Sequence, residues 1–221
     1  MSHTINILSI EPLTGDVMRY RTSKPAGYDF TPGQATEVAI DKDNWRDKKR
    51  PFTFTSLPDE DTLEFTIKSY RDHEGVTNEL QSLITGDSLI IEDPWGTIEF
   101  KGKGTFVAGG AGITPFLAIF RDLEKRGELR GNSLIFGNKT RDDIIAQDLL
   151  STMPELKIMH VLSDEDTEGY AHGFIDKEIL SANLIDISGN IYVCGPPPMM
   201  DSVMDNLKEL GAAPNALTFE K

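Results

Sequence analysis

The apolar positions of the chain follow one period before residue 102 and another after it. In the first part, short runs alternate apolar and polar side chains, as half-buried β-strands do. These runs predict strands at residues 4–10, 17–22, 36–40, 50–56, 63–69 and 88–92, and a short helix near 77–84. A turn at 58–61 predicts a hairpin between the fourth and fifth strands. About six antiparallel strands joined by short turns predict a closed β-barrel.

Apolar strands alternate with amphipathic helices in the second part of the chain. Strands are expected at residues 104–108, 133–137, 157–162, 190–194 and 217–219, and helices at 116–126, 141–151, 175–180 and 198–210. This alternation predicts a parallel sheet with helices on both faces. A polar, glycine-rich segment at 101–104 marks the change. We therefore expect a β-barrel domain over residues 1–102 and an α/β domain over 103–221.

A glycine-rich loop joins the first strand and the first helix of the α/β domain. Gly109, Gly110 and Gly112 have no Cβ, so backbone N–H groups can approach a pyrophosphate at the helix N-terminus. Thr114 adds a hydroxyl donor, and Pro115 suits the first turn of a helix. The alternative is a tight strand-to-helix turn that binds no ligand.

The predicted strand at 50–56 offers three features that a flavin needs. Alternate residues of a strand share a face, so Arg50 and Phe52 lie on one side and Thr53 on the other. The strand thus supplies a cation for phosphate, a flat platform and a hydrogen-bonding group. The alternative is an ordinary amphipathic barrel strand with an exposed arginine.

Residues 75–77 offer a second phosphate site, at the start of the short helix and close in sequence to Lys68 and Arg71. The alternative is that Thr77 only caps the helix.

The run 194–200 follows a parallel strand, where ligands of such sheets bind, and its three consecutive prolines fix a rigid turn beside Cys194. The alternatives are a buried core cysteine and a covalent nucleophile, which would lack a paired base nearby in sequence.

Composition narrows the partners and the compartment. The formal net charge is −14, and each half, 1–102 and 103–221, holds 11 Lys+Arg and 18 Asp+Glu, which is −7 each. This acidity disfavours a nucleic-acid partner, which needs a basic face. A single cysteine excludes an intrachain disulfide and a Cys-ligated iron–sulfur cluster within the chain. With no run of about 20 apolar residues and no signal peptide, we expect no membrane association and a cytoplasmic location.

The motifs together resemble those of the ferredoxin–NADP reductase superfamily over nearly the whole chain. Residues 50–53 look like the family's Arg-x-Tyr-Ser/Thr flavin motif, with Phe52 in place of the tyrosine. Residues 75–77 look like its second flavin-phosphate segment and 109–115 like its pyrophosphate loop. Residues 194–196 look like its Cys-Gly-Pro motif. The family fold, a flavin-binding barrel followed by a nucleotide-binding α/β domain, agrees with the pattern above.

The resemblance implies a role for each matched position. Arg50 would pair with flavin phosphate, Phe52 would lie against the isoalloxazine ring, and Thr53 would hydrogen-bond near flavin N5. The other implied flavin-binding positions are Pro51, Ile67, Lys68, Ser69, Tyr70, Gly75, Val76 and Thr77. The implied nicotinamide-nucleotide positions are Gly110, Gly112, Ile113, Thr114, Pro115, Asn138, Lys139, Arg141, Cys194, Gly195, Pro196 and Met199. The positions implied to act at the reacting atoms are Thr53, Cys194 and Glu220, the last in an ending that resembles the family's Glu-x-aromatic terminus but stops before the final aromatic residue.

The implied function is that of a flavoprotein reductase. Hydride would pass from nicotinamide C4 to flavin N5, and electrons would leave singly to a separate soluble acceptor such as ferredoxin, flavodoxin or an oxygenase component. FAD is favoured over FMN because residues 75–77 offer the second phosphate site. Lys139 and Arg141 favour NADPH slightly over NADH, whereas Phe174 and the acidic run 163–166 count against a 2′-phosphate. The alternatives are a reductase of free flavin or ferric chelates, or a non-catalytic flavin- or nucleotide-binding subunit.

Overall fold

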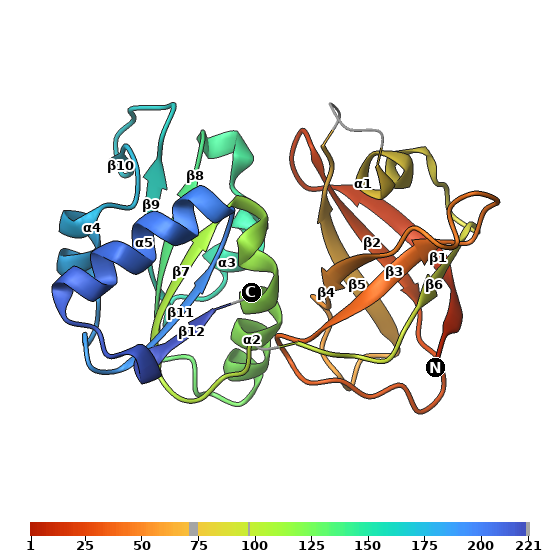
Figure 1. Ribbon diagram of the computed structural model, residues 1–221, viewed down its shortest axis with the longest axis horizontal. Coiled ribbons are helices and arrows are strands. Elements are labelled where there is room, and N and C mark those ends of the chain that lie inside the picture. The colour runs from red at the N-terminus through yellow and green to blue at the C-terminus, as the bar shows by residue number, and fades with distance from the viewer. Residues whose placement is uncertain (71–74, 97, 220–221) are drawn as a thin grey trace.

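The computed structural model describes residues 1–70, 75–96 and 98–219, which form two sheets lying side by side (Figure 1). The N-terminal sheet is antiparallel and runs in the order β4-β3-β6-β1-β2-β5. Its strands are β1 (His3–Pro12), β2 (Val17–Ser23), β3 (Ala35–Ile40), β4 (Arg50–Thr53), β5 (Thr62–Lys68) and β6 (Ser88–Ile91). Helix α1 (Val76–Glu79) and the 3₁₀ turn η1 (Leu80–Ser82) lie between β5 and β6 in the chain.

The edge strands β4 and β5 meet and close this sheet into the predicted barrel. The contact is a bridge between Phe54 and Phe65, next to a hydrogen bond from the Thr55 N–H to the Glu64 carbonyl (2.8 Å). The predicted hairpin of these two strands is limited to this short antiparallel contact, because β4 forms its ladder with β3 and β5 forms its ladder with β2. Strands that follow each other in the chain here lie at opposite edges, and they touch only because the sheet curls round on itself.

Aromatic side chains fill the barrel. Tyr20, Phe54 and Phe65 are fully buried, and the Phe54 ring stacks on Phe30 with centroids 4.2 Å apart. The Tyr20 hydroxyl donates to the Leu80 carbonyl at 3.0 Å, which ties η1 to the barrel. Burial raises the pKa of Tyr20 to about 12. The hydroxyl therefore stays protonated and keeps this donor role at any ordinary pH.

The C-terminal sheet is parallel and runs in the order β10-β9-β8-β7-β11-β12. Its strands are β7 (Gly104–Gly109), β8 (Ser133–Asn138), β9 (Lys157–Leu162), β10 (Ala171–His172), β11 (Asn190–Cys194) and β12 (Leu217–Phe219). The helical segments are η2 (Gly110–Ile113), α2 (Thr114–Lys125), η3 (Arg141–Asp143), α3 (Gln147–Ser151), α4 (Lys177–Asn183), α5 (Pro197–Leu210) and η4 (Pro214–Ala216). Buried residues of α2 and α3 share one apolar cluster and those of α4 and α5 another, so helices cover both faces as predicted.

The helix predicted over residues 141–151 is wrong, because the chain breaks it in the middle. Thr140 and Asp143 form a reciprocal capping box, which starts the short turn η3. Ile144 is then extended, and Ala146 takes a left-handed conformation with φ 57° before α3 begins. The apolar residues in this segment keep a helical spacing although the backbone does not. The two-residue strand β10 was not predicted, since it is too short to show an alternation.

The two domains share buried residues. Val17 of β2 and Ile98 of the connecting segment belong to the same apolar cluster as Phe116 and Ile119 of α2. The chain is closely packed here, because a Cβ on Gly33 would lie 2.1 Å from the Ile98 carbonyl oxygen and 3.2 Å from Cδ1 of Ile119 in α2. Gly33 has φ 95°, so glycine suits both the turn and the contact.

The connecting segment between the sheets is fixed to β11. The Tyr192 hydroxyl donates to the Gly102 carbonyl at 2.7 Å and accepts from the Lys101 N–H at 2.9 Å. A Cβ on Gly104 would lie 2.0 Å from the Asn190 carbonyl oxygen, so β7 and β11 begin in close contact. Across the described ranges, no helix has the length and apolar character that a membrane span requires.

Candidate functional site

The candidate nucleotide site lies at the centre of the parallel sheet, where β7 and β11 are neighbours. β7 leads into α2 on one face of the sheet, whereas β11 leads into α5 on the other face. The winding direction reverses between these strands, and ligands of such sheets bind beyond the carboxyl ends of the strands at that point. The predicted cofactor segments 109–115 and 194–199 both lie there.

Glycines let these two segments touch. A Cβ on Gly112 would lie 2.2 Å from the Cys194 carbonyl oxygen, and a Cβ on Gly109 would lie 2.2 Å from the Met199 sulfur. A Cβ on Gly195 would lie 2.8 Å from the same sulfur. Close packing alone therefore explains why these three positions are glycine. Gly110 differs, because it has φ 49° and open space where a Cβ would project. That gap is where a phosphate could approach the backbone.

The start of α2 is built as the sequence predicted. Thr114 begins the helix and Pro115 lies in its first turn. The Thr114 hydroxyl donates to the Ala111 carbonyl at 3.1 Å, which leaves its lone pairs as acceptors for a ligand. Ile113 is buried and anchors η2 beneath the loop. The helix dipole places partial positive charge at this end, which favours an anion.

The end of β11 lies directly against the glycine loop. Cys194 is 6% exposed and belongs to the apolar cluster on the α2 side of the sheet. Gly195 and Pro196 make the turn into α5, and Met199 packs against the cluster on the opposite face. This position is compatible with both alternatives for Cys194, a core thiol and a residue beside the nicotinamide.

On the flavin side, β4 is an edge strand whose only ladder partner among the described strands is β3. Arg50 and Pro51 are exposed, and Nη1 of Arg50 donates to the Lys49 carbonyl at 2.8 Å. Phe52 is half-buried against the barrel core. Thr53 is 9% exposed, and no described residue forms a hydrogen bond with its hydroxyl. The strand therefore offers a cation, an aromatic ring and a hydroxyl without a partner among the described residues, all within four positions.

Gly75 and the start of α1 form the second flavin segment. Gly75 is the N-cap residue, it has open space at its Cβ position, and Val76 behind it is buried. The capping role considered for Thr77 is wrong, because Thr77 lies two residues after the cap and makes no side-chain cap. The Thr77 carbonyl instead accepts a hydrogen bond from Oγ of Ser69 at 3.0 Å. This bond joins α1 to the end of β5.

The neighbouring positions of β5 differ in what they present. Ile67 is buried in the barrel, whereas Tyr70 is half exposed. Lys68 forms an ion pair with Asp16 at 2.8 Å, so a phosphate at Lys68 would compete with a carboxylate. Arg71, which the sequence suggested as a second cation, and Glu220, the C-terminal candidate, lie outside the described residues.

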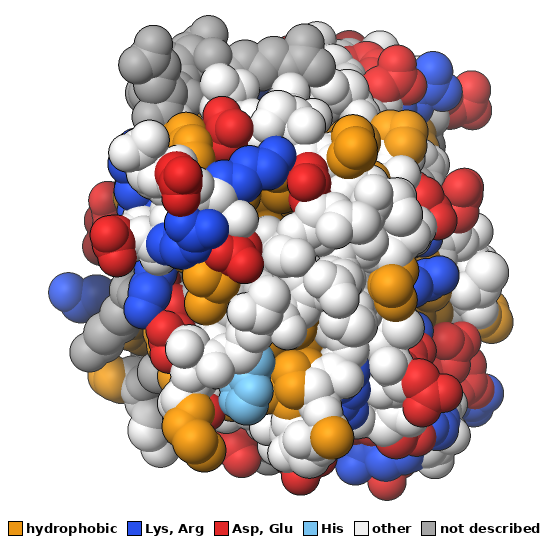
Figure 2. All heavy atoms as spheres, turned by 90° about the vertical axis from the view of Figure 1, so that its right-hand side faces the viewer, with side chains coloured by type: hydrophobic (Ala, Val, Ile, Leu, Met, Phe, Trp, Pro, Cys, Tyr) orange, Lys and Arg blue, Asp and Glu red, His pale blue; other side chains and the backbone are white. Residues whose placement is uncertain are grey.

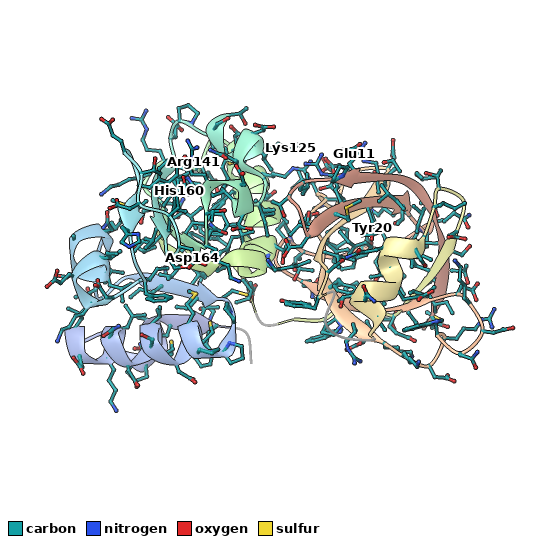
Figure 3. All side chains as sticks on the ribbon, turned by 90° about the horizontal axis from the view of Figure 1, so that it is seen from above. Glu11, Tyr20, Lys125, Arg141, His160 and Asp164 are labelled. Atoms are coloured by element: carbon teal, nitrogen blue, oxygen red, sulfur yellow. The ribbon has the colours of Figure 1, made fainter. Side chains whose placement is uncertain are left out.

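The adenosine-side candidates follow β8. Lys139 is exposed, and Arg141 is engaged by Glu165, which comes from the segment after β9. Nε of Arg141 donates to Oε1 of Glu165 at 2.9 Å, and the Arg141 backbone N–H donates to Oε2 at 2.8 Å. Figure 3 labels Arg141, His160 and Asp164 on the α/β half of the molecule. One carboxylate thus occupies two donors that an anionic ligand would use.

Two buried polar groups on this side of the sheet have no partner among the described residues. The first is the side-chain amide of Asn138, in which neither the nitrogen nor the oxygen has a partner, and the second is Nδ1 of His160. His160 lies between the rings of Phe136 and Tyr170, with centroids 6.0 and 5.7 Å away, and burial lowers its pKa. An unpaired buried amide costs about 1–3 kcal/mol, so the Asn138 amide would gain from a ligand that both donates and accepts.

The arrangement fits a flavin on the barrel and a nicotinamide nucleotide on the parallel sheet. The open position at Gly110, the unpaired Thr53 hydroxyl and the orphaned Asn138 amide are the observations that carry this fit. The two sites adjoin, since β5 contacts η2. Within residues 1–70, 75–96 and 98–219, no cluster of three or more His, Cys, Asp or Glu could hold a metal ion.

Sequence reasoning missed the long-range partners at this junction. Arg121 of α2 and Glu60 of the β4–β5 turn form an ion pair across the domains, and Glu165 holds Arg141. The sequence did contain a signal for Arg121, which lies seven residues after Thr114. Seven residues make about two helical turns, so the two side chains lie on the same side of the helix. No local pattern would have found its partner.

Comparisons with known proteins agree with this geometry. An FAD-binding domain family matches residues 2–103, and an oxidoreductase NAD-binding domain family matches residues 106–205. The propane 2-monooxygenase reductase component of Rhodococcus jostii (strain RHA1) is 27% identical over 97% of this chain and 62% of its own length. The naphthalene 1,2-dioxygenase system ferredoxin–NAD(P)(+) reductase component of Pseudomonas putida is 26% identical over 94% of this chain and 65% of its own length. The chain therefore spans less than two thirds of each of these relatives.

A solved structure shows the same fold. The ferredoxin NADP⁺ reductase from Neisseria gonorrhoeae, with bound FAD and NADP, superposes with a TM-score of 0.87 at 20% identity, over 99% of this chain and 98% of that one. Fold and site together define a two-domain protein with a barrel for a flavin and a parallel sheet for a nicotinamide nucleotide. The chain belongs to the ferredoxin–NADP reductase superfamily.

Proposed function

We propose that the protein is a reductase that uses a nicotinamide nucleotide to reduce a bound FAD and passes the electrons to a separate acceptor. Residues 1–102 hold the flavin in this proposal, and residues 103–221 hold the nucleotide. The observation that carries it is the contact of the loops 109–112 and 194–199 at the sheet's switch point, next to strand β5 of the barrel. That contact brings both predicted nicotinamide segments to the flavin side of the molecule.

When bound, the two cofactors supply a hydride transfer, two electrons and one proton, followed by release of the electrons one at a time. The chain's own residues bind and orient. Arg50 neutralises flavin phosphate, Phe52 supports the ring, and Thr53 directs its hydroxyl at the reactive nitrogen. On the other side the start of α2 holds the pyrophosphate, and Thr114 and Cys194 border the nicotinamide. No side chain has to act as a general base.

The relatives' names support a protein acceptor. The propane 2-monooxygenase and naphthalene 1,2-dioxygenase relatives are reductase components of oxygenase systems, so a ferredoxin or an oxygenase component is the proposed acceptor. The outer face of the barrel carries interspersed acidic and basic side chains, with apolar ones scattered singly (Figure 2). Such a face favours a polar, transient contact over a permanent apolar interface.

For the donor, the contacts of Arg141 favour NADH. A 2′-phosphate at this position would have to displace the Glu165 carboxylate from both the side chain and the backbone N–H of Arg141. Like charges would also repel. A ribose 2′-hydroxyl, in contrast, can donate to such a carboxylate, as acidic residues do in NAD-specific sheets of this kind. We therefore propose NADH as the preferred donor, with Glu165 as the residue that disfavours NADPH.

The function is tested by the visible spectrum of the purified, FAD-loaded protein under anaerobic conditions. We expect the flavin absorbance to bleach on addition of NADH and more slowly with NADPH. A flavin that bleaches with neither nucleotide would contradict reductase activity and leave a binding subunit. Failure to retain FAD would contradict the assignment of the Arg50 strand.

The donor preference is tested by Glu165→Gln. We expect the ratio of kcat/KM for NADPH to that for NADH to rise about tenfold, because one like charge is removed and Arg141 is released. Asp164→Asn is the matched control, since Asp164 accepts a hydrogen bond from Ser163 and does not contact Arg141. An equal rise in both variants would indicate general charge reduction and contradict the role of Glu165.

A further inference from the structure

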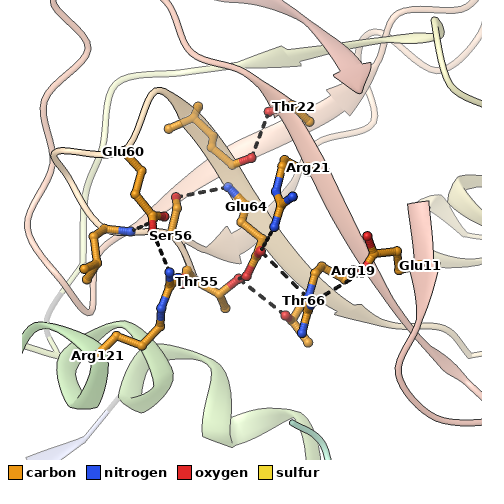
Figure 4. Close-up of polar contacts among 12 residues, drawn as sticks. Glu11, Arg19, Arg21, Thr22, Thr55, Ser56, Glu60, Glu64, Thr66 and Arg121 are labelled. Carbon is orange, nitrogen blue, oxygen red and sulfur yellow. Dashed lines mark hydrogen bonds and ion pairs between the residues drawn. The ribbon is translucent and has the colours of Figure 1, made fainter. Parts of the chain in front are cut away.

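One arginine joins the two cofactor domains. Nη1 of Arg121, in α2, donates to the Thr55 carbonyl at 2.5 Å, and Nη2 donates to Oε1 of Glu60 at 2.5 Å (Figure 4). Both acceptors belong to the segment between β4 and β5. A guanidinium that binds two acceptors at once has a fixed orientation, which a single point charge would not have.

The receiving end of this contact is itself rigid. Oε2 of Glu60 accepts the Leu57 N–H at 3.0 Å, and the Glu60 N–H donates back to the Leu57 carbonyl at 3.2 Å. Thr55 is 1% exposed, and its hydroxyl donates to Oε1 of Glu64 at 3.0 Å. Neither acceptor can follow Arg121 if α2 moves. The contact therefore resists displacement of the helix relative to the barrel.

Arg121 links the two cofactor segments by short, stiff paths. It lies two helical turns after Thr114, so about 10 Å of helix separates it from the nucleotide loop. Its partner Thr55 lies two residues after Thr53, about 7 Å along extended chain from the flavin strand. The Arg121 contact is thus one of those that set the separation of the two loops, together with the contact of β5 with η2.

A second ion pair on the same side of α2 provides a comparison. Lys125, four residues after Arg121, pairs with Asp59 of the same turn. The side chains of this pair, Lys125 and Asp59, are 55% and 64% exposed. Those of Arg121 and Glu60 are 23% and 37% exposed. Exposed pairs of this kind contribute little, because water and salt screen them. Lys125 can therefore serve as a control for Arg121.

We infer that Arg121 is a positioning residue, which fixes the distance between the nicotinamide loop and the flavin strand. This inference rests on the proposed function. Hydride transfer requires the reacting atoms about 3–3.5 Å apart, and a misplacement of about 1 Å can cost a large factor in rate. Loss of the Arg121 contact should thus slow hydride transfer more than it weakens the binding of either cofactor.

Three variants test the inference by anaerobic stopped-flow with NADH. Arg121→Met removes both hydrogen bonds, Arg121→Lys keeps the charge without the fork, and Glu60→Gln weakens the acceptor. We expect the rate constant of flavin reduction to fall about tenfold in Arg121→Met and less in the other two. The dissociation constant of NADH and the FAD content should stay within about twofold, and Lys125→Met should match the wild type.

A second measurement does not depend on activity. Nitroxide labels at Asp43→Cys on the barrel and Lys208→Cys on α5, in a Cys194→Ser background, report the distance between the domains by double electron–electron resonance. Both positions are exposed. We expect one narrow distance distribution with Arg121 present and a broader one with Arg121→Met.

The outcomes separate this inference from the proposed function. An unchanged reduction rate in all three variants overturns the inference, as does a loss shared equally by the rate, the NADH affinity and the FAD content. If the wild type itself is not reduced by either nucleotide, the proposed function fails. The distance distribution then decides whether Arg121 positions the domains, and an unchanged distribution overturns that.

Discussion

Replacing Gly112 by alanine tests whether close contact of the two nicotinamide loops holds the site together. The new Cβ would lie 2.2 Å from the carbonyl oxygen of Cys194, 2.5 Å from its carbonyl carbon and 2.6 Å from the Gly195 nitrogen. All three are backbone atoms at the end of a buried strand, so no side chain can swing away. The loops would have to separate by about 1 Å to reach an ordinary contact.

The expected loss follows from the cost of overpacking. Extra atoms forced into a close-packed interior typically cost about 1–3 kcal/mol, and an obstruction made only of backbone places this case at about 3 kcal/mol. We expect the free energy of unfolding of Gly112→Ala to fall by that amount. The dissociation constant of the nicotinamide nucleotide should also rise, because its loop is displaced, while FAD binding on the barrel is retained.

Urea denaturation followed by far-UV circular dichroism measures the loss. Gly15→Ala is the stability control, since Gly15 lies in the turn between β1 and β2, has open space at its Cβ position and has no left-handed φ. It should change the free energy of unfolding by no more than about 0.5 kcal/mol. A loss below about 1 kcal/mol for Gly112→Ala would refute the reasoning, because it would show that the loops separate at little cost.

Two further predictions concern Thr53 and His160. Thr53→Val should slow flavin reduction in anaerobic stopped-flow by about tenfold, the equivalent of one hydrogen bond, whereas Thr53→Ser should retain the rate; equal rates for valine and threonine would contradict a role for the hydroxyl. Burial lowers the pKa of His160 below its usual value of 6.5. Under acidic conditions the unfolded chain therefore binds a proton that the folded protein does not. The free energy of unfolding should fall as the pH drops below 6.5. In urea denaturation at about pH 7.5 and about pH 5.5, His160→Phe should lose less stability than the wild type, by up to about 1 kcal/mol, and parallel losses would contradict this reason.

The sequence predicted the parallel sheet almost residue by residue. The strands at 157–162, 190–194 and 217–219 have the predicted bounds. The helix predicted over residues 141–151 is wrong for a physical reason. A left-handed residue such as Ala146 interrupts a helix without changing the spacing of apolar side chains, and that spacing was the only signal in use.

At the site, the local motifs could be located from the sequence, whereas the distant partners of the arginines could not. The glycine loop and the Cys194 segment could be placed from sequence because strand ends in a parallel sheet meet at one edge. The partners of Arg121 and Arg141 could not, since they lie 61 and 24 residues away along the chain. Both contacts depend on turns that bring separate elements together, and a hydrophobic pattern does not record turns of that kind.

The cluster shared by Val17, Ile98 and α2 means that neither half of the chain is a self-contained module. A cut between residues 102 and 103 would leave the side chains of Val17 and Ile119 facing water, on surfaces prone to association. It would also release the connecting segment from Tyr192. A chimera that exchanges the α/β half with that of a relative would therefore have to bring α2 and its complementary barrel surface together. Evolution and engineering alike are thus expected to transfer the two halves as a pair.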